Sequence, residues 1–355
     1  MNQFENQFLK PDAKIASWQN LQKSIEEMEA ASPYRREKET ERTEKINPKD
    51  SENPKFAEIG ELKIEHIKDR ESPKIDKIVE FMEKFAPEEA DTPEIIRDAV
   101  ANPTDAYAYH TIENQKGETI SHAQSSYLEL TDENDQPLNQ SIIFGGFVIT
   151  ADEYRRKRLA DEIWQSALRC NLEKAQKKNQ ELKAIVVEGK EESEPFWNHV
   201  GLKRVYFEDA QGNLHETPYI QPPIDWNNRT GLPKGYKKGD DMKKFSVPEH
   251  LMIKPTDNRN EITTQELMPI ISAIYSDNYT LYRNEGEKYP TDKAIESTQE
   301  IVGQFQTELK QTLSQAKEGK LYLLDAKERE QKMMEFKAAG KNFEHFMFSE
   351  KENGE

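Results

Sequence analysis

The pattern of apolar and polar positions is clearest in the middle of the chain. Residues 142–149 form a nearly continuous apolar run, which is typical of a buried strand. A short polar turn follows over residues 150–154. Apolar residues then recur with helical spacing on one face of the next segment, at Leu159, Ile163 and Ala167 and at Ala160, Trp164 and Leu168. The pattern therefore predicts a strand, a tight turn and an amphipathic helix.

Similar patterns predict elements on both sides of this centre. Before it we expect a strand over residues 59–67 and a helix over 75–85. A second short helix should begin at Thr92 and Pro93, an N-cap residue followed by proline at the first helical position. A hairpin should follow, with strands over residues 106–112 and 119–130. After the central helix we expect a strand over 182–187, a helix ending near residue 201 and a strand over 202–207. The predicted order is strand, two helices, three antiparallel strands, helix, strand, helix, strand.

The flanking segments differ in composition from this region. Residues 1–55 are polar, with one possible helix over 15–28 and dense mixed charge over 35–50, which predicts a polar helical or disordered arm. A further strand is expected over residues 214–220. Residues 221–255 are rich in Pro, Gly and Lys and predict loops, with one strand near 251–253. Residues 256–355 predict helices over 263–275, 293–316 and 326–348. We therefore predict an arm over 1–55, a domain over 56–255 and a mainly helical C-terminal extension over 256–355.

Composition narrows the classes of partner. The 355 residues are 34% hydrophobic and 33% charged, with a formal net charge of −17. Such an acidic chain is a poor general binder of nucleic acid or of anionic membranes. The charge would attract cationic partners such as amines or basic peptides, or it serves solubility alone. The single cysteine, Cys170, excludes an intrachain disulfide. The first residues lack the pattern of a signal peptide and no apolar run approaches a membrane span, so we expect a cytoplasmic protein.

A cluster of cations stands directly before the central helix, at Arg155, Arg156, Lys157 and Arg158. The first backbone N–H groups of a helix lack intrahelical partners, and the helix dipole favours negative charge there. Cations at this end oppose the dipole, and a bound anion would remove the conflict. The arrangement predicts a phosphate or pyrophosphate site. The alternative is an ordinary solvated helix start.

These residues resemble the acyl-CoA-binding motif of the GNAT superfamily of N-acetyltransferases. The family pattern, Arg/Gln-x-x-Gly-x-Gly/Ala, reads here as Arg155-x-x-Arg158-x-Ala160, with Arg158 where the family usually has glycine. Residues 196–202 resemble a second family pattern, Phe-Tyr-x-x-x-Gly-Phe. The resemblance covers residues 56–222 approximately. It implies an α+β fold with a mixed sheet, the GNAT-like acyl-CoA N-acyltransferase fold, here with a helical C-terminal extension.

The resemblance also implies an activity, the transfer of an acetyl group from acetyl-CoA to an amine by direct attack. The acceptor would be a small-molecule amine or an amine of a protein or peptide. In the family, the strand edge holds the pantetheine arm and the thioester carbonyl, and the start of the helix holds the diphosphate. The residues at these positions are Val148, Ile149 and Thr150 on the strand, and Arg155, Arg156, Lys157, Arg158, Leu159 and Ala160 at the helix start.

A general base is needed because the attacking amine must be neutral. We select Glu188, which follows the predicted strand over 182–187, although it also fits a solvated loop carboxylate. His110, His122 and His199 are alternatives with no positional argument. Trp197 stands where many family members have a tyrosine that protonates the leaving thiolate.

Trp197 and one further departure from the family pattern leave the function open. Lys190 replaces an asparagine that often contacts the cofactor in the family. No pair of His and Cys residues has the sequence spacing of a metal site. A GNAT-fold binding or regulatory module with weakened catalysis is therefore the alternative function, and a simple interaction protein is a third.

Overall fold

The computed structural model describes residues 11–32, 34–36, 43–46, 62–87, 90–102, 106–223, 226–227, 232–233, 235–238, 240–278 and 292–344. The chain forms two compact units. Unit 1 comprises Met1–Leu128 and Asn139–Lys183, and unit 2 comprises Glu129–Leu138 and Ala184–Glu355. The three-part organisation expected from composition, with boundaries near residues 55 and 255, stays a prediction.

Unit 1 is built on a sheet whose strands follow the order β1-β2-β3-β4-β5-β6. The pairs β1/β2, β2/β3, β3/β4 and β4/β5 are antiparallel. The elements are α1 (Pro11–Ala30), β1 (Tyr34–Arg36), β2 (Thr43–Ile46), β3 (Leu62–Ile67), α3 (Lys74–Phe85), α4 (Pro93–Ala101), β4 (Tyr107–Glu113), β5 (Thr119–Thr131), β6 (Pro137–Thr150), a 3-10 turn (Asp152–Tyr154) and α5 (Leu159–Lys178).

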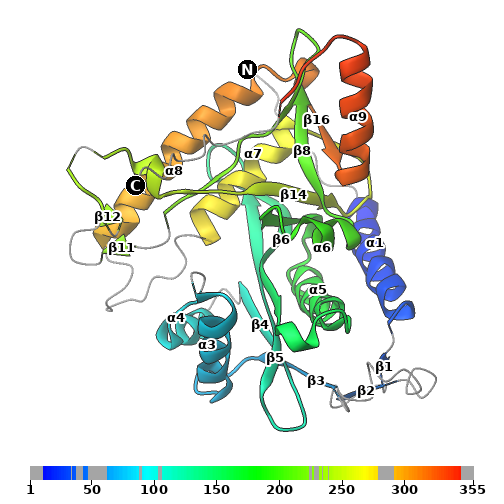
Figure 1. The fold of residues 1–355 in the computed structure, drawn as a ribbon, viewed down its shortest axis with the longest axis vertical. Coiled ribbons are helices and arrows are strands. Elements are labelled where there is room, and N and C mark those ends of the chain that lie inside the picture. Colours follow the sequence, from blue (N-terminus) through cyan, green and yellow to red (C-terminus); the bar gives the residue numbers. More distant parts are fainter. Residues whose placement is uncertain are drawn as a thin grey trace. The chain divides into compact units, whose positions relative to one another are not determined.

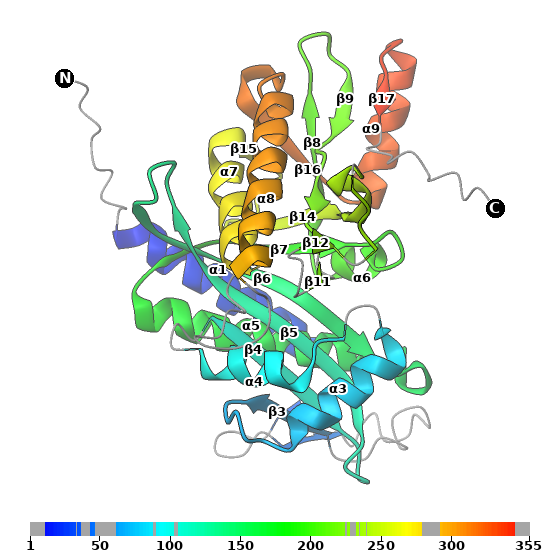
Figure 2. The same cartoon turned by 90° about the vertical axis from the view of Figure 1, so that its left-hand side faces the viewer.

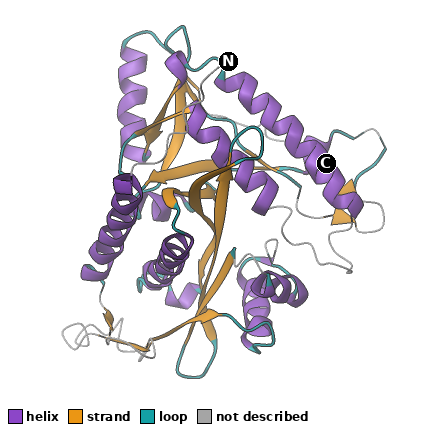
Figure 3. Ribbon diagram, turned by 180° about the vertical axis from the view of Figure 1, so that it is seen from behind, coloured by secondary structure: helices purple, strands orange, loops and turns teal. Residues whose placement is uncertain are grey.

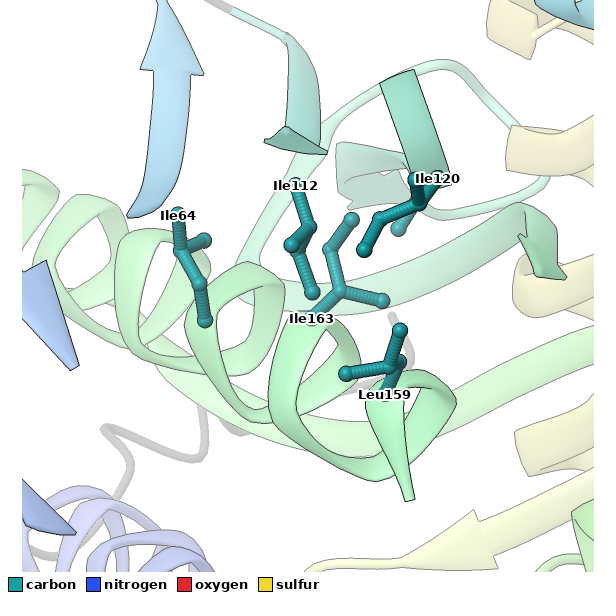
Figure 4. Packing of buried hydrophobic residues seen from close by; sticks show 6 residues of the cluster. Ile64, Ile112, Ile120, Leu159 and Ile163 are labelled. Carbon is teal, nitrogen blue, oxygen red and sulfur yellow. The ribbon is translucent and has the colours of Figure 1, made fainter. Parts of the chain in front are cut away.

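Helices cover both faces of the unit 1 sheet (Figures 1 and 3). Helices α3 and α4 lie on one face, and α5 and α1 lie on the other. Helix α5 buries Leu159 and Ile163 against isoleucines of β3, β4 and β5 (Figure 4). Burying one such aliphatic side chain contributes about 1.5–3 kcal/mol, so this cluster fixes the position of the start of α5.

The N-terminal arm is part of this packing. Helix α1 lies against α5 and buries Leu21 and Ile25. The Trp18 indole donates a hydrogen bond of 2.9 Å to the Gln180 carbonyl. The helix predicted for the arm is thus present, while the short strands β1 and β2 were not expected from the mixed charge of this segment.

The predicted order of elements in the centre of the chain is confirmed, as β3, α3, α4, β4, β5, β6, α5, β7, α6 and β8. Thr92 caps α4 as predicted, since its hydroxyl accepts a hydrogen bond of 3.4 Å from the Ile95 N–H. The first residues of the strand expected over 59–67 lie outside the described part of the chain.

Unit 2 has the strand order β7-β14-β8-β16-β15, and each of these pairs is antiparallel. Its elements are β7 (Glu181–Gly189), α6 (Glu194–His199), β8 (Lys203–Glu208), β9 (Leu214–Glu216), β10 (Ile220–Gln221), β11 (Trp226–Asn227), β12 (Leu232–Pro233), a 3-10 turn (Met242–Phe245), β13 (Val247–Pro248), β14 (His250–Pro255), β15 (Glu261–Thr263), α7 (Thr264–Ala273), a π-helical turn (Ile274–Asn278), α8 (Asp292–Leu313), a 3-10 turn (Lys317–Gly319), β16 (Lys320–Leu324), α9 (Ala326–Ala338) and β17 (Phe343–Glu344).

The C-terminal region is helical, as predicted, and it also contributes to the sheet. Helices α7 and α8 lie side by side (Figure 2). Strand β16 pairs with β8 from Leu321 opposite Phe207 to Leu324 opposite Arg204. The short apolar run over residues 321–324 is therefore a central strand of unit 2.

Three boundaries differ from the prediction for local reasons. Strand β9 ends at Glu216, just before Pro218, which has no N–H to donate. Helix α9 ends at Ala338, and Gly340 follows with φ 71°, a left-handed conformation that suits glycine. Residues 221–255 contain short paired strands in addition to loops. Residues 345–348, the end of the predicted last helix, lie outside the described part of the chain.

Candidate functional site

The last residues of β6 form the first part of the candidate site. Residues 146–150 are half-buried, whereas residues 141–145 before them are fully buried. The Val148 side chain packs against the cluster beneath α5. The Ser121 hydroxyl on β5 lies 2.9 Å from the Ile149 carbonyl oxygen and 3.0 Å from the Thr150 hydroxyl. These contacts hold the end of β6 in place while leaving it only partly covered.

The turn between β6 and α5 contains two arginines in a strained backbone conformation. Arg156 has φ 64° and Arg158 has φ 61°, in the left-handed region that disfavours residues with a Cβ atom. Arg158 stands where the family pattern that this segment resembles usually has glycine. The backbone therefore adopts a conformation that glycine would adopt readily, although the residue is arginine.

Helix α5 begins at Leu159 without a side-chain cap. Its first main-chain hydrogen bond runs from the Glu162 N–H to the Arg158 carbonyl, at 3.2 Å. The amides of Leu159 and Ala160 precede that bond, so helix geometry gives them no partner. A small anion could accept hydrogen bonds from both.

The four cations of the turn have different surroundings. Arg155 pairs with Asp152 at 2.8 Å, with side chains 66% and 70% exposed. Arg156 is also exposed. The Lys157 ammonium lies 5.0 Å from the centroid of the Tyr154 ring. Arg158 is turned back onto the protein, where it pairs with Asp161 at 2.8 Å and donates to the Ala31 carbonyl.

The two carboxylates in the first turn of α5 are buried. Asp161 accepts from Arg158, and Glu162 accepts a hydrogen bond from the Ser32 hydroxyl. Both are engaged within unit 1, and the exposed charged residues before the helix are Asp152, Glu153, Arg155 and Arg156.

Glu188 lies on β7 in unit 2, half-buried and opposite Leu251 of β14. Its carboxylate accepts hydrogen bonds from the Tyr219 hydroxyl and, at 3.4 Å, from the Gln221 side chain. Tyr219 stacks on Tyr275, with centroids 5.5 Å apart. Burial, and secondarily the charge of Glu188, raises the pKa of the Tyr275 phenol.

The remaining sequence candidates are located as follows. Trp197 is 4% exposed and packs edge-on to Phe196, so it is a packed aromatic. His110 and His122 are buried in the unit 1 sheet, and burial lowers the pKa of His122 to about 4. His199 is exposed at the end of α6. A buried imidazole cannot meet a substrate amine, which weakens His110 and His122 as candidates for the base.

The structure brings the nine predicted cofactor-binding residues together in unit 1 and assigns Glu188 to unit 2. Sequence reasoning missed Tyr219 and Gln221 beside Glu188. A signal was present, since residues two apart in an extended segment share one face. The third member, Tyr275, is distant in the sequence and lies in a π-helical turn that gives no such signal.

Comparisons with known proteins give structural matches only. No protein-family profile matches the chain, and no curated protein matches its sequence. Solved structures similar to part of this chain are acetyltransferases. An aminoglycoside acetyltransferase from an uncultured soil metagenomic sample has 11% identity and a TM-score of 0.31 over 39% of this chain and 87% of that one.

Two further matches cover more of this chain. Ard1 from Thermoplasma volcanium has 12% identity and a TM-score of 0.32 over 55% of this chain and 97% of its own. Arabidopsis thaliana NAA60 in complex with a bisubstrate analogue has 9% identity and a TM-score of 0.33 over 54% and 97%. No described helix has the length and apolar character needed to cross a bilayer.

Proposed function

We propose that this protein is a GNAT-type N-acetyltransferase that transfers an acetyl group from acetyl-CoA to an amine. The observation that supports this most is the start of α5. It combines an uncapped helix N-terminus, two left-handed arginines before it and exposed guanidinium groups beside it. Strained residues of this kind persist where the surrounding structure or a ligand requires them.

In this proposal the diphosphate of acetyl-CoA binds at the start of α5. The Leu159 and Ala160 amides donate to its oxygens, and Arg155 and Arg156 neutralise its charge. Arg155 would exchange its exposed pair with Asp152, an interaction of little energy, for the diphosphate. Lys157 and Arg158 shape the turn rather than contact the ligand. The pantetheine arm would follow the half-buried end of β6 at Val148, Ile149 and Thr150.

The proposed reaction is a direct attack. The amine nitrogen forms a bond to the thioester carbonyl carbon, the carbon–sulfur bond breaks, and CoA leaves as the thiolate. Glu188 accepts the proton that the amine loses, and Tyr219 stabilises the carboxylate through its hydrogen bond. The role of Glu188 rests on its chemistry and its strand position. The net charge of −17 favours cationic acceptors, so a test panel should contain polyamines and lysine-rich peptides.

Calorimetric titration with acetyl-CoA tests the binding half of the proposal. We expect micromolar binding by the unmodified protein and a loss of at least about tenfold, or 1.4 kcal/mol, in Arg155→Ala/Arg156→Ala. Arg70→Ala is the matched control, because Arg70 is 54% exposed and pairs with Glu71 much as Arg155 pairs with Asp152. Equal affinities in all three proteins would reject the site.

The alternative is a module that binds acyl-CoA without transferring the acyl group. The packed position of Trp197 favours it, because an indole there supplies no acid for the leaving thiolate. Release of free thiol with the amine panel separates the two functions. If the protein is an enzyme, Glu188→Gln should lower kcat by roughly 10²-fold or more and leave acetyl-CoA affinity unchanged. Binding without thiol release for any amine would support the alternative.

A further inference from the structure

A second group of reactive side chains lies in unit 1, in the half of α5 away from its uncapped start. Cys170 on α5 meets His66 on β3 and His110 on β4. One ligand atom from each of the three residues lies within 4.8 Å of those of the others. Cys170 follows Leu159 by eleven residues, which places it about 16 Å further along the helix. The group is therefore separate from the proposed acetyl-CoA site.

The fold assembles this group from one continuous packing surface. Ile64 pairs with Ile112 across β3 and β4, and His66 pairs with His110 in the same register. Residues two apart on a strand face the same side, so both histidines extend the surface that the isoleucines offer to α5. On the helix, Cys170 follows Ile163 by seven residues, which keeps it on the same stripe. On this packing surface, two imidazoles and one thiol therefore meet where apolar side chains would otherwise pack.

The distances between Cys170 and His66 are close to those between two ligands of one metal ion. Cys170 Sγ lies 3.6 Å from His66 Nδ1 and 3.9 Å from His66 Nε2. Tetrahedral zinc, with bonds near 2.3 Å to sulfur and 2.0–2.1 Å to nitrogen, places sulfur and nitrogen roughly 3.6 Å apart. The His66 and His110 rings are stacked, with centroids 4.7 Å apart and planes 14° apart. Rotation of these rings about their side-chain bonds would direct a nitrogen of each toward one ion.

Two of the three residues are buried and the third is half-buried. His110 is 0% exposed and Cys170 is 8% exposed, while His66 is half-buried and leaves an approach from solvent. The neighbouring strand supports the position of His110, because His122 Nδ1 lies 2.9 Å from the His110 carbonyl oxygen. Two nitrogen ligands and one sulfur ligand are the donor set that Zn²⁺ prefers among divalent ions, with a fourth position left for water.

We propose that His66, His110 and Cys170 bind a zinc ion that ties α5 to β3 and β4. On binding, the Cys170 thiol loses its proton to solvent and the thiolate bonds to the metal, with no change in oxidation state. The inference stands without the acetyltransferase proposal, since it needs neither acetyl-CoA nor an acceptor.

Titration of the untagged, reduced full-length protein with Co²⁺ alone tests the proposal. Cobalt in a tetrahedral site with sulfur shows visible d–d bands and an ultraviolet thiolate-to-metal band. The chain has one cysteine, so any thiolate band reports Cys170 directly. We expect these bands to saturate at one equivalent, and Zn²⁺ to abolish them by competition. A folded protein that shows no thiolate band would overturn the proposal.

Variants identify the remaining ligands. Cys170→Ser should remove the thiolate band, and His66→Asn should weaken Co²⁺ binding by more than the roughly 10–100-fold that loss of a supporting hydrogen bond causes. His199→Asn, at an exposed histidine of α6, is the matched control and should bind as the unmodified protein does. If Cys170→Ser does not fold, the half-exposed His66 supplies the decisive variant. Unchanged affinity in folded His66→Asn would reject the three-ligand site.

Discussion

Arg204 on β8 and Arg156 before α5 carry the same guanidinium group in opposite surroundings. Arg204 is 2% exposed and pairs with Glu191 at 2.6 Å, with Glu194, and with Glu216 at 3.5 Å. Arg329 on α9 adds a second contact to Glu194, at 2.6 Å. Arg156 is exposed and has a left-handed backbone. Arg204 is therefore neutralised within unit 2, whereas Arg156 is exposed to solvent.

Two helix starts of unit 2 differ from the start of α5 in a similar way. Helix α7 begins with a capping box of Thr263 and Glu266, and α9 begins with one of Asp325 and Glu328. Each box satisfies two main-chain amides reciprocally. Helix α5 has no side-chain cap. Helices α3 and α6 also begin without a side-chain cap, so what distinguishes α5 is the left-handed Arg158 at its N-cap and the exposed cations before it.

The largest effect should come from removing a partner of the buried arginines. Glu194→Ala leaves Arg204 and Arg329 each with one carboxylate contact fewer in a buried setting. Breaking a buried ion pair in this way costs about 3–5 kcal/mol, so we expect the free energy of unfolding to fall by about 3 kcal/mol. Urea unfolding followed by circular dichroism measures it. Asp152→Ala, which breaks the exposed pair with Arg155, should cost at most about 0.5 kcal/mol.

The pH dependence of stability provides a second measurement of the same group. Burial alone would raise the pKa of Glu194, but hydrogen bonding from Arg329 and the charge of Arg204 outweigh it and hold this pKa below its ordinary value. Its stabilisation is therefore present above pH 4.5 and is lost as the pH falls through the lower folded value. Glu194→Gln should flatten the acid limb of the stability curve. An identical acid limb in both proteins would argue against a paired carboxylate.

A further prediction concerns a negative side chain placed at the uncapped start of α5. Arg158→Asp places a carboxylate beside the Leu159 and Ala160 amides, where it would compete with a diphosphate and repel it. Arg158→Gly removes the same cation without adding negative charge, and it suits the φ of 61°. We expect acetyl-CoA to bind Arg158→Asp at least about tenfold, or 1.4 kcal/mol, more weakly than Arg158→Gly in calorimetry. Equal affinities would mean that the start of α5 does not hold the ligand.

The fold was largely predictable from the sequence because its central elements have strong local signals. Thr92 and Pro93 predict the start of α4, and the apolar stripe through Leu159 and Ile163 predicts α5. The cation cluster predicted a phosphate or pyrophosphate site at the start of α5, and that site stays a prediction. The strain at Arg156 and Arg158 could not be predicted, because an arginine gives no sign of a positive φ.

Features that depend on contacts between segments distant in the sequence could not be predicted. Glu188 was selected from its strand position alone, and its hydrogen-bond partner Tyr219 stacks on Tyr275, which follows Glu188 by 87 residues. The group of His66, His110 and Cys170 has no metal-site spacing along the chain, because three separate elements supply one ligand each. The role of Arg158 in contacting the Ala31 carbonyl likewise depends on where α1 packs.

A third prediction tests the closed helix starts. Thr263→Ala removes the hydroxyl that accepts from the Glu266 N–H at 3.2 Å, and should lower the free energy of unfolding by about 1 kcal/mol. The affinity for acetyl-CoA should stay unchanged, since this cap serves the fold of unit 2. Thr263→Ser, which keeps the hydroxyl, is the control and should retain most of the stability. A loss of acetyl-CoA affinity in Thr263→Ala would remove the distinction between the two kinds of helix start.

The smallest expected effect concerns backbone strain at the open start. An alanine at the left-handed Arg156 position costs about 1–2 kcal/mol, whereas glycine there costs only its extra entropy of about 0.5–1 kcal/mol. Arg156→Gly should therefore be about 0.5 kcal/mol more stable than Arg156→Ala in urea unfolding. Arg155 has φ −59°, so the order should reverse there, with Arg155→Gly less stable than Arg155→Ala. Because both positions lie in one exposed turn, the same order at both would show that the turn relaxes in solution and that no strain is held for a ligand.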